Sequence, residues 1–176
     1  ALSAEQKIEE AISHYKMAIG LKPDYAEAYN NLAAALFSIK KTEEAISHYK
    51  MAIKLKPDYA KAYNNLGNAL LNKGRTGEAI SHYKMAIKLN SDYALAYNNL
   101  GNALSAERKI EEAITHYKMA IELKPGYSEA HHNLGNVLFN AKMTEEAIDY
   151  YKMAIKIKPD YVDAYNNLGI ILFAER

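Results

Sequence analysis

The chain has 176 residues, of which 49% are hydrophobic and 24% are charged, which fits a folded protein with a substantial core and excludes a disordered or fibrous one. Its 22 Lys and Arg residues nearly balance 21 Asp and Glu residues, so a net charge of +1 gives no strong field to attract nucleic acid or an anionic membrane. The absence of cysteine excludes disulfides, a thiolate nucleophile and cysteine metal ligands.

The N-terminal residues lack the apolar segment of a signal peptide, and no apolar run reaches the roughly 18 residues expected of a membrane span. We therefore expect neither a membrane partner nor a nucleic-acid partner. A chain without cysteine is compatible with a reducing compartment, and the expected location is cytoplasmic. The sequence begins at Ala1 without methionine, which is compatible with a fragment of a longer protein.

The sequence repeats itself every 34 residues. One tripeptide recurs at this interval as Pro23-Asp24-Tyr25, Pro57-Asp58-Tyr59, Ser91-Asp92-Tyr93, Pro125-Gly126-Tyr127 and Pro159-Asp160-Tyr161. Residues 23–56 match residues 57–90 at about 24 of 34 positions, and self-similarity at a fixed period indicates stacked supersecondary units. We predict one array over residues 1–176, with partial repeats at 1–22 and 159–176 and full repeats at 23–56, 57–90, 91–124 and 125–158.

Each repeat is predicted to be a hairpin of two helices. In residues 57–90 the apolar side chains recur at helical spacing in two stretches, Tyr63, Leu66 and Leu70 and then Ala79, Tyr83, Ala86 and Ile87. Asp24 and Thr42 are positioned to cap the two helices of residues 23–56. The partial repeat 1–22 then supplies only a second helix, and 159–176 only a first helix.

Four first helices carry a glycine in their interior, at Gly67, Gly101, Gly135 and Gly169. Glycine there costs roughly 1 kcal/mol relative to alanine, so we expect each one to permit the close approach of another helix.

These positions resemble the tetratricopeptide repeat family, whose W-x-x-L-G-x-x-Y, A-x-x-x-F and P pattern corresponds to Tyr63, Leu66, Gly67, Leu70, Ala79, Tyr83 and Ser91. Ala33 replaces the glycine of the first full repeat, and His131 replaces the first aromatic residue of the fourth. The resemblance covers the whole chain. It implies an all-α fold, a right-handed α-solenoid of antiparallel helix pairs, with first helices lining a concave groove and second helices forming the convex back.

Asparagine recurs in three columns on the predicted first helices. The first column is Asn31, Asn65, Asn99, Asn133 and Asn167, the second is Asn68, Asn102 and Asn136, and the third is Asn30, Asn64, Asn98 and Asn166. An amide has one acceptor oxygen and two donor hydrogens, so it can bond to the backbone of an extended peptide whatever its side chains are. The alternative is that these amides cap turns, bond to neighbouring repeats, or reflect recent duplication of one sequence.

Resemblance favours peptide binding. The N-N-L-G-N run is similar to the tetratricopeptide arrays of O-linked N-acetylglucosamine transferases and of bacterial scaffold proteins, and in the transferases a concave asparagine ladder holds polypeptide. Helices roughly 8 to 10 Å apart and a rise of about 3.3 Å per ligand residue predict a contact at roughly every third residue. We expect the first column to contact the peptide without supporting the fold, and His132 to add a pH-sensitive contact to the groove.

The carboxylate clamp of the same family, which binds chaperone C-termini, is not expected. It needs a lysine just after the first-helix aromatic residue, where this chain has Asn30, Asn64, Asn98, His132 and Asn166.

We also expect no enzyme activity, no metal and no cofactor. His14, His48, His82 and His116 form a column, but residues in adjacent repeats lie near 10 Å apart, whereas zinc ligands lie about 2 Å from the metal. No Gly-rich phosphate loop or pair of opposed carboxylates is indicated.

The two ends of the sequence predict a second possible role. The last helix carries Ile170, Ile171 and Phe173 without a polar cap, and the first carries Ile12 and Tyr15 without a partner helix. Copies of the chain would then join head to tail as a self-assembling array. A third possibility is a non-catalytic, substrate-recognition part of a larger enzyme.

Overall fold

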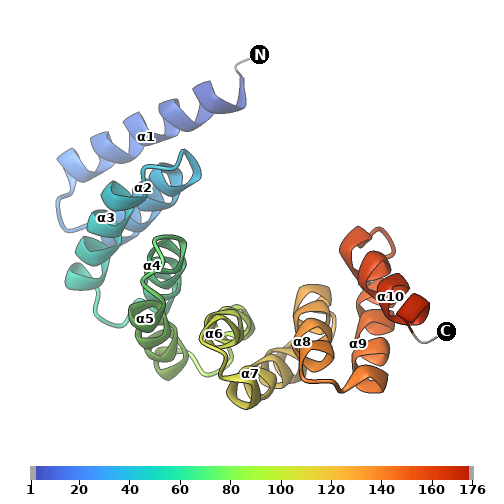
Figure 1. Ribbon diagram of the computed structural model, residues 1–176. Helices are drawn as coiled ribbons and strands as arrows, with labels where there is room; N and C mark the ends of the chain where they lie inside the picture. The colour runs from blue at the N-terminus through green and yellow to red at the C-terminus, as the bar shows by residue number, and fades with distance from the viewer. Residues whose placement is uncertain (1–2, 175–176) are drawn as a thin grey trace. The chain divides into compact units, whose positions relative to one another are not determined.

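The computed structural model describes residues 3–174, and this part of the chain is entirely helical apart from turns (Figure 1). The helices are α1 (Ala4–Leu21), α2 (Ala26–Ser38), α3 (Thr42–Leu55), α4 (Ala60–Asn72), α5 (Thr76–Leu89), α6 (Ala94–Ala106), α7 (Ile110–Leu123), α8 (Ser128–Asn140), α9 (Thr144–Ile157) and α10 (Val162–Ala174). Four hairpins are formed by α2 with α3, α4 with α5, α6 with α7 and α8 with α9. The predicted all-α class and the antiparallel helix pairs are confirmed.

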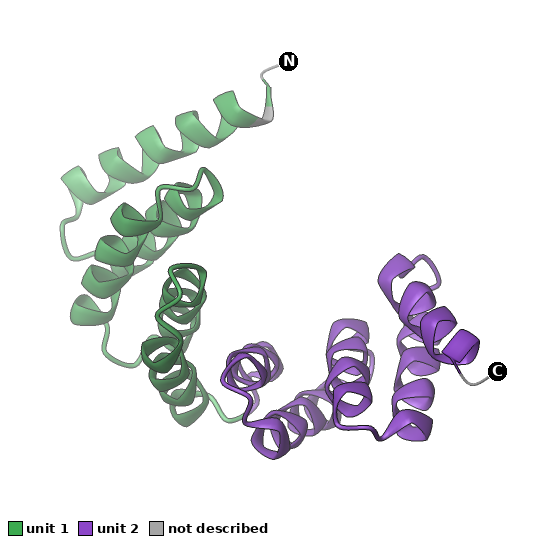
Figure 2. Ribbon diagram, in the orientation of Figure 1, with its two compact units in different colours: residues 1–91 green, residues 92–176 purple. Residues whose placement is uncertain are grey.

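The chain divides into two compact units, residues 1–91 with α1 to α5 and residues 92–176 with α6 to α10 (Figure 2). Within each unit a second helix packs on the first helix of its own hairpin and on the first helix of the next, as α3 packs on α2 and on α4. The single array predicted for residues 1–176 stays a prediction.

Each hairpin has the same core. In the α4–α5 hairpin, Leu66 and Leu70 of α4 lie against Ala79, Tyr83 and Ala86 of α5, and none of these five residues is more than 1% exposed. Small alanines on the second helix let the backbones approach, while the leucines and the tyrosine fill the space between them.

The interior glycines lie where a tyrosine of the partner helix crosses. A Cβ atom added to Gly67 would lie 2.5 Å from Cε1 of Tyr83, and one added to Gly101 would lie 2.6 Å from Cε1 of Tyr117. The predicted close approach is confirmed there and at Gly135, which meets Tyr151. It is wrong for Gly169, whose Cβ position has no atom within 4 Å in the described part of the chain.

The turn inside each hairpin is a left-handed helix end. The residue two places before the second helix has a positive φ in all four hairpins: Lys40 (63°), Gly74 (73°), Arg108 (58°) and Lys142 (66°). In the first of them, the N–H of Lys41 donates to the C=O of Leu36 at 2.9 Å and so satisfies a carbonyl at the end of α2. Only Gly74 signals this conformation in the sequence.

The predicted side-chain caps are wrong. The N-cap residues of α2 and α3 are Tyr25 and Lys41, and neither makes a side-chain cap bond, because α2 begins two residues after Asp24 and α3 begins at Thr42 itself.

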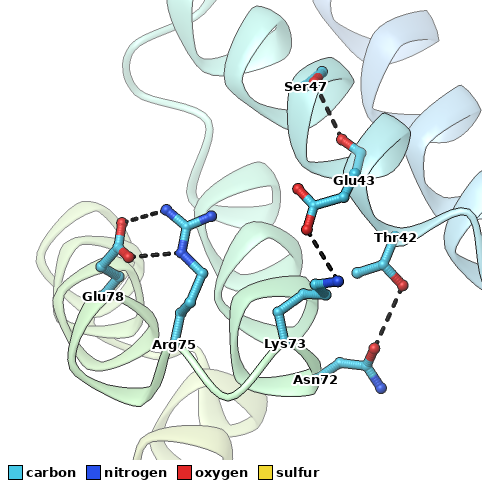
Figure 3. Close-up of polar contacts among 7 residues, drawn as sticks. All are labelled: Thr42, Glu43, Ser47, Asn72, Lys73, Arg75 and Glu78. Atoms are coloured by element: carbon cyan, nitrogen blue, oxygen red, sulfur yellow. Dashed lines mark hydrogen bonds and ion pairs between the residues drawn. The ribbon is translucent and has the colours of Figure 1, made fainter.

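Thr42 instead joins two hairpins of the first unit (Figure 3). Its hydroxyl donates to Oδ1 of Asn72 at 3.4 Å, and Nζ of Lys73 lies 3.1 Å from Oε1 of the neighbouring Glu43. The start of α3 and the end of α4 are therefore joined by a part-buried hydrogen bond and by a more exposed ion pair, of which the ion pair contributes modestly.

Candidate functional site

The first-column asparagines are half-buried on the first helices, and most of their described hydrogen bonds join neighbouring repeats. In the first unit, Nδ2 of Asn65 donates to Oδ1 of Asn30 at 3.0 Å. In the second unit, Nδ2 of Asn133 donates to Oδ1 of Asn98 and to Oδ1 of Asn102, both at 3.1 Å. The expectation that this column does not support the fold is therefore wrong for Asn65 and Asn133, whose amides bridge adjacent first helices.

The same pattern continues at the last described helix. Nδ2 of Asn167 lies 2.9 Å from Oδ1 of Asn136 and 3.2 Å from Nε2 of His132. Burial lowers the pKa of His132 against the opposing charges of Asp163 and Glu129, which keeps the ring neutral at neutral pH, so that Nε2 accepts the bond from Asn167. The ring also lies 4.9 Å from that of Tyr161, centroid to centroid.

The third column is inside the protein. Asn30 is 1% exposed, Asn64 and Asn98 are 0% exposed, and His132, which takes the same place in α8, is 8% exposed. Their predicted direct contact with a peptide is wrong, because the side chains point into the interface between successive first helices. Asn166 is exposed on α10.

Each second-column asparagine accepts a hydrogen bond from a tyrosine on the second helix of its own hairpin. The hydroxyls of Tyr83, Tyr117 and Tyr151 donate to Oδ1 of Asn68, Asn102 and Asn136, each at 2.7 Å. Burial raises the pKa of all three tyrosines above the usual range, so the hydroxyls remain protonated donors. Each tyrosine that crosses a glycine therefore also fixes the amide next to that glycine.

This network leaves defined amide atoms available in the second unit. Oδ1 of Asn102 and Oδ1 of Asn136 each accept two bonds, whereas their Nδ2 atoms have no hydrogen-bond partner among residues 3–174. Asn167 shows the converse arrangement. Its Nδ2 bonds to His132 and Asn136, whereas its Oδ1 accepts no hydrogen bond among residues 3–174. Fixed donors and a fixed acceptor thus remain on one face.

These atoms belong to residues that line two hollows. The polar hollow, about 200 Å³, lies between α6 and α8 and is lined by Asn102, Ser105, Tyr117, Asn133, Asn136, Val137 and Asn140. The second hollow, about 350 Å³, lies between α8 and α10 and is lined by Asn136, Asn140, Tyr151 and Asn167 together with Phe139 and Ile170. We call it the apolar hollow after Phe139 and Ile170, which have no apolar counterpart in the polar hollow. The two hollows share Asn136 and Asn140, and no charged side chain lines either, so together they form a continuous, uncharged surface.

The first unit has a hollow of about 320 Å³ between α1 and α2, lined by Asn31 and Tyr15 together with Lys7, Ile8, Ala11, Ala34 and Ala35. Ala34 stands here where the other hairpins have a second-column asparagine. This part of the surface therefore offers fewer amide groups.

The histidine column has a packing role. The rings of His48 and His82 lie 6.0 and 5.9 Å from those of Tyr29 and Tyr63, one from each helix of a hairpin. No group of three or more histidine or acidic residues in the described chain is arranged to hold a metal ion. Among the described helices none combines the length and apolar character needed to cross a membrane.

Family models decide the identity of the repeat. A TPR repeat model matches residues 1–40, 35–74 and 67–107, and a tetratricopeptide repeat model matches residues 94–127 and 128–161. The chain is a tetratricopeptide repeat protein. It is accordingly a scaffold for protein–protein interaction, and the closer resemblance to the O-linked N-acetylglucosamine transferase arrays stays a prediction.

Solved tetratricopeptide repeat structures share this fold. The chain is similar to MamA, with 27% identity, coverage of 93% of this chain and 99% of that one, and a TM-score of 0.78. It is also similar to TTC0263, a thermophilic TPR protein of Thermus thermophilus, with 21% identity, coverage of 96% and 92%, and a TM-score of 0.79. A chain of the APC/C hetero-tetramer Cut9–Hcn1 matches with 21% identity, coverage of 97% and 34%, and a TM-score of 0.84. No curated protein sequence gave a significant match.

Proposed function

We propose that this tetratricopeptide repeat protein binds an extended polypeptide segment on the first-helix face, through the backbone of the segment. The carrying observation is the set of amide atoms that the internal network leaves available, Nδ2 of Asn102 and Asn136 and Oδ1 of Asn167. Peptide C=O groups need donors and peptide N–H groups need acceptors, and this face supplies both. In this proposal Asn102, Asn136 and Asn167 serve both the inter-repeat network and the ligand.

The network also prepares these amides for binding. Asn136 is held by the hydroxyl of Tyr151 and by the amide of Asn167, so its free N–H groups are fixed in direction before a ligand arrives. A side chain that is already ordered loses little rotamer freedom on binding, and that loss is otherwise about 0.5 to 1.5 kcal/mol. Binding through backbone groups makes the site permissive about ligand sequence.

The test replaces the donor group of one amide and keeps its acceptor oxygen. Asn136→Asp keeps an oxygen that accepts from Tyr151 and Asn167, but it replaces the N–H donors by a second acceptor that repels a peptide carbonyl. Dodecapeptides selected from a random display library on the unaltered chain should bind Asn136→Asp at least about tenfold more weakly, measured by calorimetry.

Asn72→Asp is the matched control, because it adds the same charge at the exposed last residue of α4, which contacts Thr42 and lines neither hollow of the second unit. Its affinity should be unchanged. Equal affinities of Asn136→Asp and the unaltered chain would contradict the proposal.

A second candidate function, self-association of the 176-residue chain, is favoured by the open site at Gly169. In the complete hairpins the equivalent glycines are covered by Tyr83, Tyr117 and Tyr151. Tyr15 is the corresponding tyrosine of α1 and is only half-buried, so Tyr15 of one copy fits over Gly169 of another. Ile170 and Phe173, at 52% and 74% exposed, would border this joint.

Two of the other residues predicted at the ends differ in their accessibility. Ile171 is 1% exposed, so its predicted place on the end surface is wrong. It takes the position of Val137, on the side of the first helix that packs toward the preceding hairpin. Ile12 is half-buried on α1 and remains accessible to a partner.

Gly169→Leu tests the joint, because the new side chain would occupy the place of the incoming tyrosine. In sedimentation equilibrium we expect the average mass of the unaltered chain to rise with concentration, and that of Gly169→Leu to stay at the monomer value. Gly77→Leu is the control, since Gly77 also has no atom within 4 Å of its Cβ position among the described residues. A monomeric unaltered chain at high concentration would refute self-association.

A further inference from the structure

The two hollows of the second unit are the same site in successive repeats. Their lining residues correspond at an interval of 34, as Asn102 with Asn136, Ser105 with Phe139, Tyr117 with Tyr151, Asn133 with Asn167 and Asn136 with Ile170. The tyrosine and the first-column amide are the same in both hollows, and among these five corresponding pairs the side chain becomes apolar at two.

Both changes add apolar surface to the second hollow, whose other lining residues are amides and a tyrosine. Phe139 stands in place of Ser105, and Ile170 stands in place of an asparagine that the three preceding hairpins with this column all carry. Ile170 is 52% exposed, so its side chain is presented to solvent at the rim. The hollow is also larger, about 350 Å³ against about 200 Å³. An exposed apolar wall beside fixed amides suits a ligand with an apolar side chain and a polar backbone.

Charge argues against other ligands. Neither hollow is lined by a charged side chain, and the tyrosines that line them stay protonated because burial raises their pKa. A charged ligand side chain placed there would lose water without gaining a partner of opposite charge. An uncharged segment meets no such penalty.

We propose, as an extension that rests on the proposed function, that the apolar hollow is a side-chain specificity pocket. It takes an aliphatic or aromatic side chain of an extended, uncharged segment whose backbone is held by Asn136 and Asn167. The polar hollow takes a small or polar side chain of the same segment. With first helices roughly 8 to 10 Å apart and a rise of about 3.3 Å per residue, these two side chains are about three residues apart.

The experiment uses the same random dodecapeptide library on the full chain. Peptides selected on the unaltered chain should share an apolar residue about three positions from a small or polar one, with few charged residues between them. The double variant Phe139→Ser with Ile170→Asn copies the preceding repeat into the hollow. It should bind the selected peptides about tenfold more weakly or worse, and selection on it should lose the apolar position.

Leu172→Asn is the matched control, because Leu172 is 50% exposed on the same helix and does not line the hollow. Its peptide binding should be unchanged. If selected peptides depend on Asn136 but show no apolar position and tolerate the double variant, the specificity pocket is refuted while backbone binding stands.

Two further outcomes would also overturn the inference. If no peptide is selected on the unaltered chain, backbone binding and the specificity pocket both fail. If Ile170→Asn leaves peptide affinity intact but lowers the average mass in sedimentation equilibrium, the hollow is an interface between copies of the chain.

Discussion

Gly101→Ala should destabilise the protein by about 1 to 3 kcal/mol, although alanine is the better helix former by about 1 kcal/mol. The added Cβ would lie 2.6 Å from Cε1 of Tyr117, so the ring must move. That ring is anchored by its 2.7 Å hydrogen bond to Asn102, and a shift large enough to relieve the clash stretches this bond. Urea unfolding of the variant and the unaltered chain measures the difference in the free energy of unfolding.

Gly169→Ala is the control and should have the opposite sign. No described atom lies within 4 Å of its Cβ position, so the helix propensity acts alone and stabilises α10 by up to about 1 kcal/mol. The first hairpin shows how alanine is accommodated: Ala33 replaces the glycine, and Ala34 replaces the asparagine that would anchor Tyr49. Equal stability changes for Gly101→Ala and Gly169→Ala would contradict the role of the anchored ring.

Asn65→Ala combined with Asn133→Ala should destabilise the protein by about 2 to 5 kcal/mol. Each substitution removes the amide that donates to a buried acceptor, Oδ1 of Asn30 in the first unit and Oδ1 of Asn98 in the second. A buried acceptor left without a donor costs about 1 to 3 kcal/mol, which exceeds the gain in helix propensity from alanine. The two sites lie in different units and share no hydrogen-bond partner among those described, so their effects should add.

Asn140→Ala provides the comparison for this pair. Asn140 is exposed and makes no hydrogen bond within the described part of the chain, so its replacement should leave the free energy of unfolding nearly unchanged. Thermal unfolding followed by circular dichroism separates the two cases. A double variant as stable as the unaltered chain would show that the amides do not support the fold.

Much of the fold was predictable from the sequence because the repeat has a constant length and the core residues recur at the same places in each repeat. The period of 34 predicts the hairpins. The helical spacing of Leu66, Gly67 and Leu70 on the first helix, and of Ala79 and Tyr83 on the second, predicts the two faces that pack together. Helix ends were less predictable. Asp24 and Thr42 are typical cap residues, yet α2 and α3 both begin without a side-chain cap. The left-handed turn residues Lys40, Arg108 and Lys142 are not the glycines that usually mark this conformation.

The residues of the candidate site were predictable from the sequence, but the direction in which each side chain points was not. Asn30 and Asn31 are neighbours on one helix, and their side chains point about 100° apart, so one is buried while the other is half-buried. The sequence shows neither which of the two faces the next helix nor which amide atoms the tyrosines occupy. His132 likewise aligns with the asparagines, and only the structure places it 3.2 Å from Asn167 inside the interface.

The described hydrogen bonds that first-column asparagines make between first helices run one way along the chain, from a later amide to an earlier acceptor, as from Asn133 to Asn98 and from Asn167 to Asn136. In these repeats the first-column asparagine therefore donates to the preceding repeat, and the acceptor oxygens of each repeat are used by the following repeat. If residues 125–158 were excised, Asn167 would meet the acceptors of Asn98 and Asn102 that Asn133 now uses. Such a protein can gain or lose whole repeats without leaving these acceptors unpaired, so the length of its first-helix face can evolve separately from its stability.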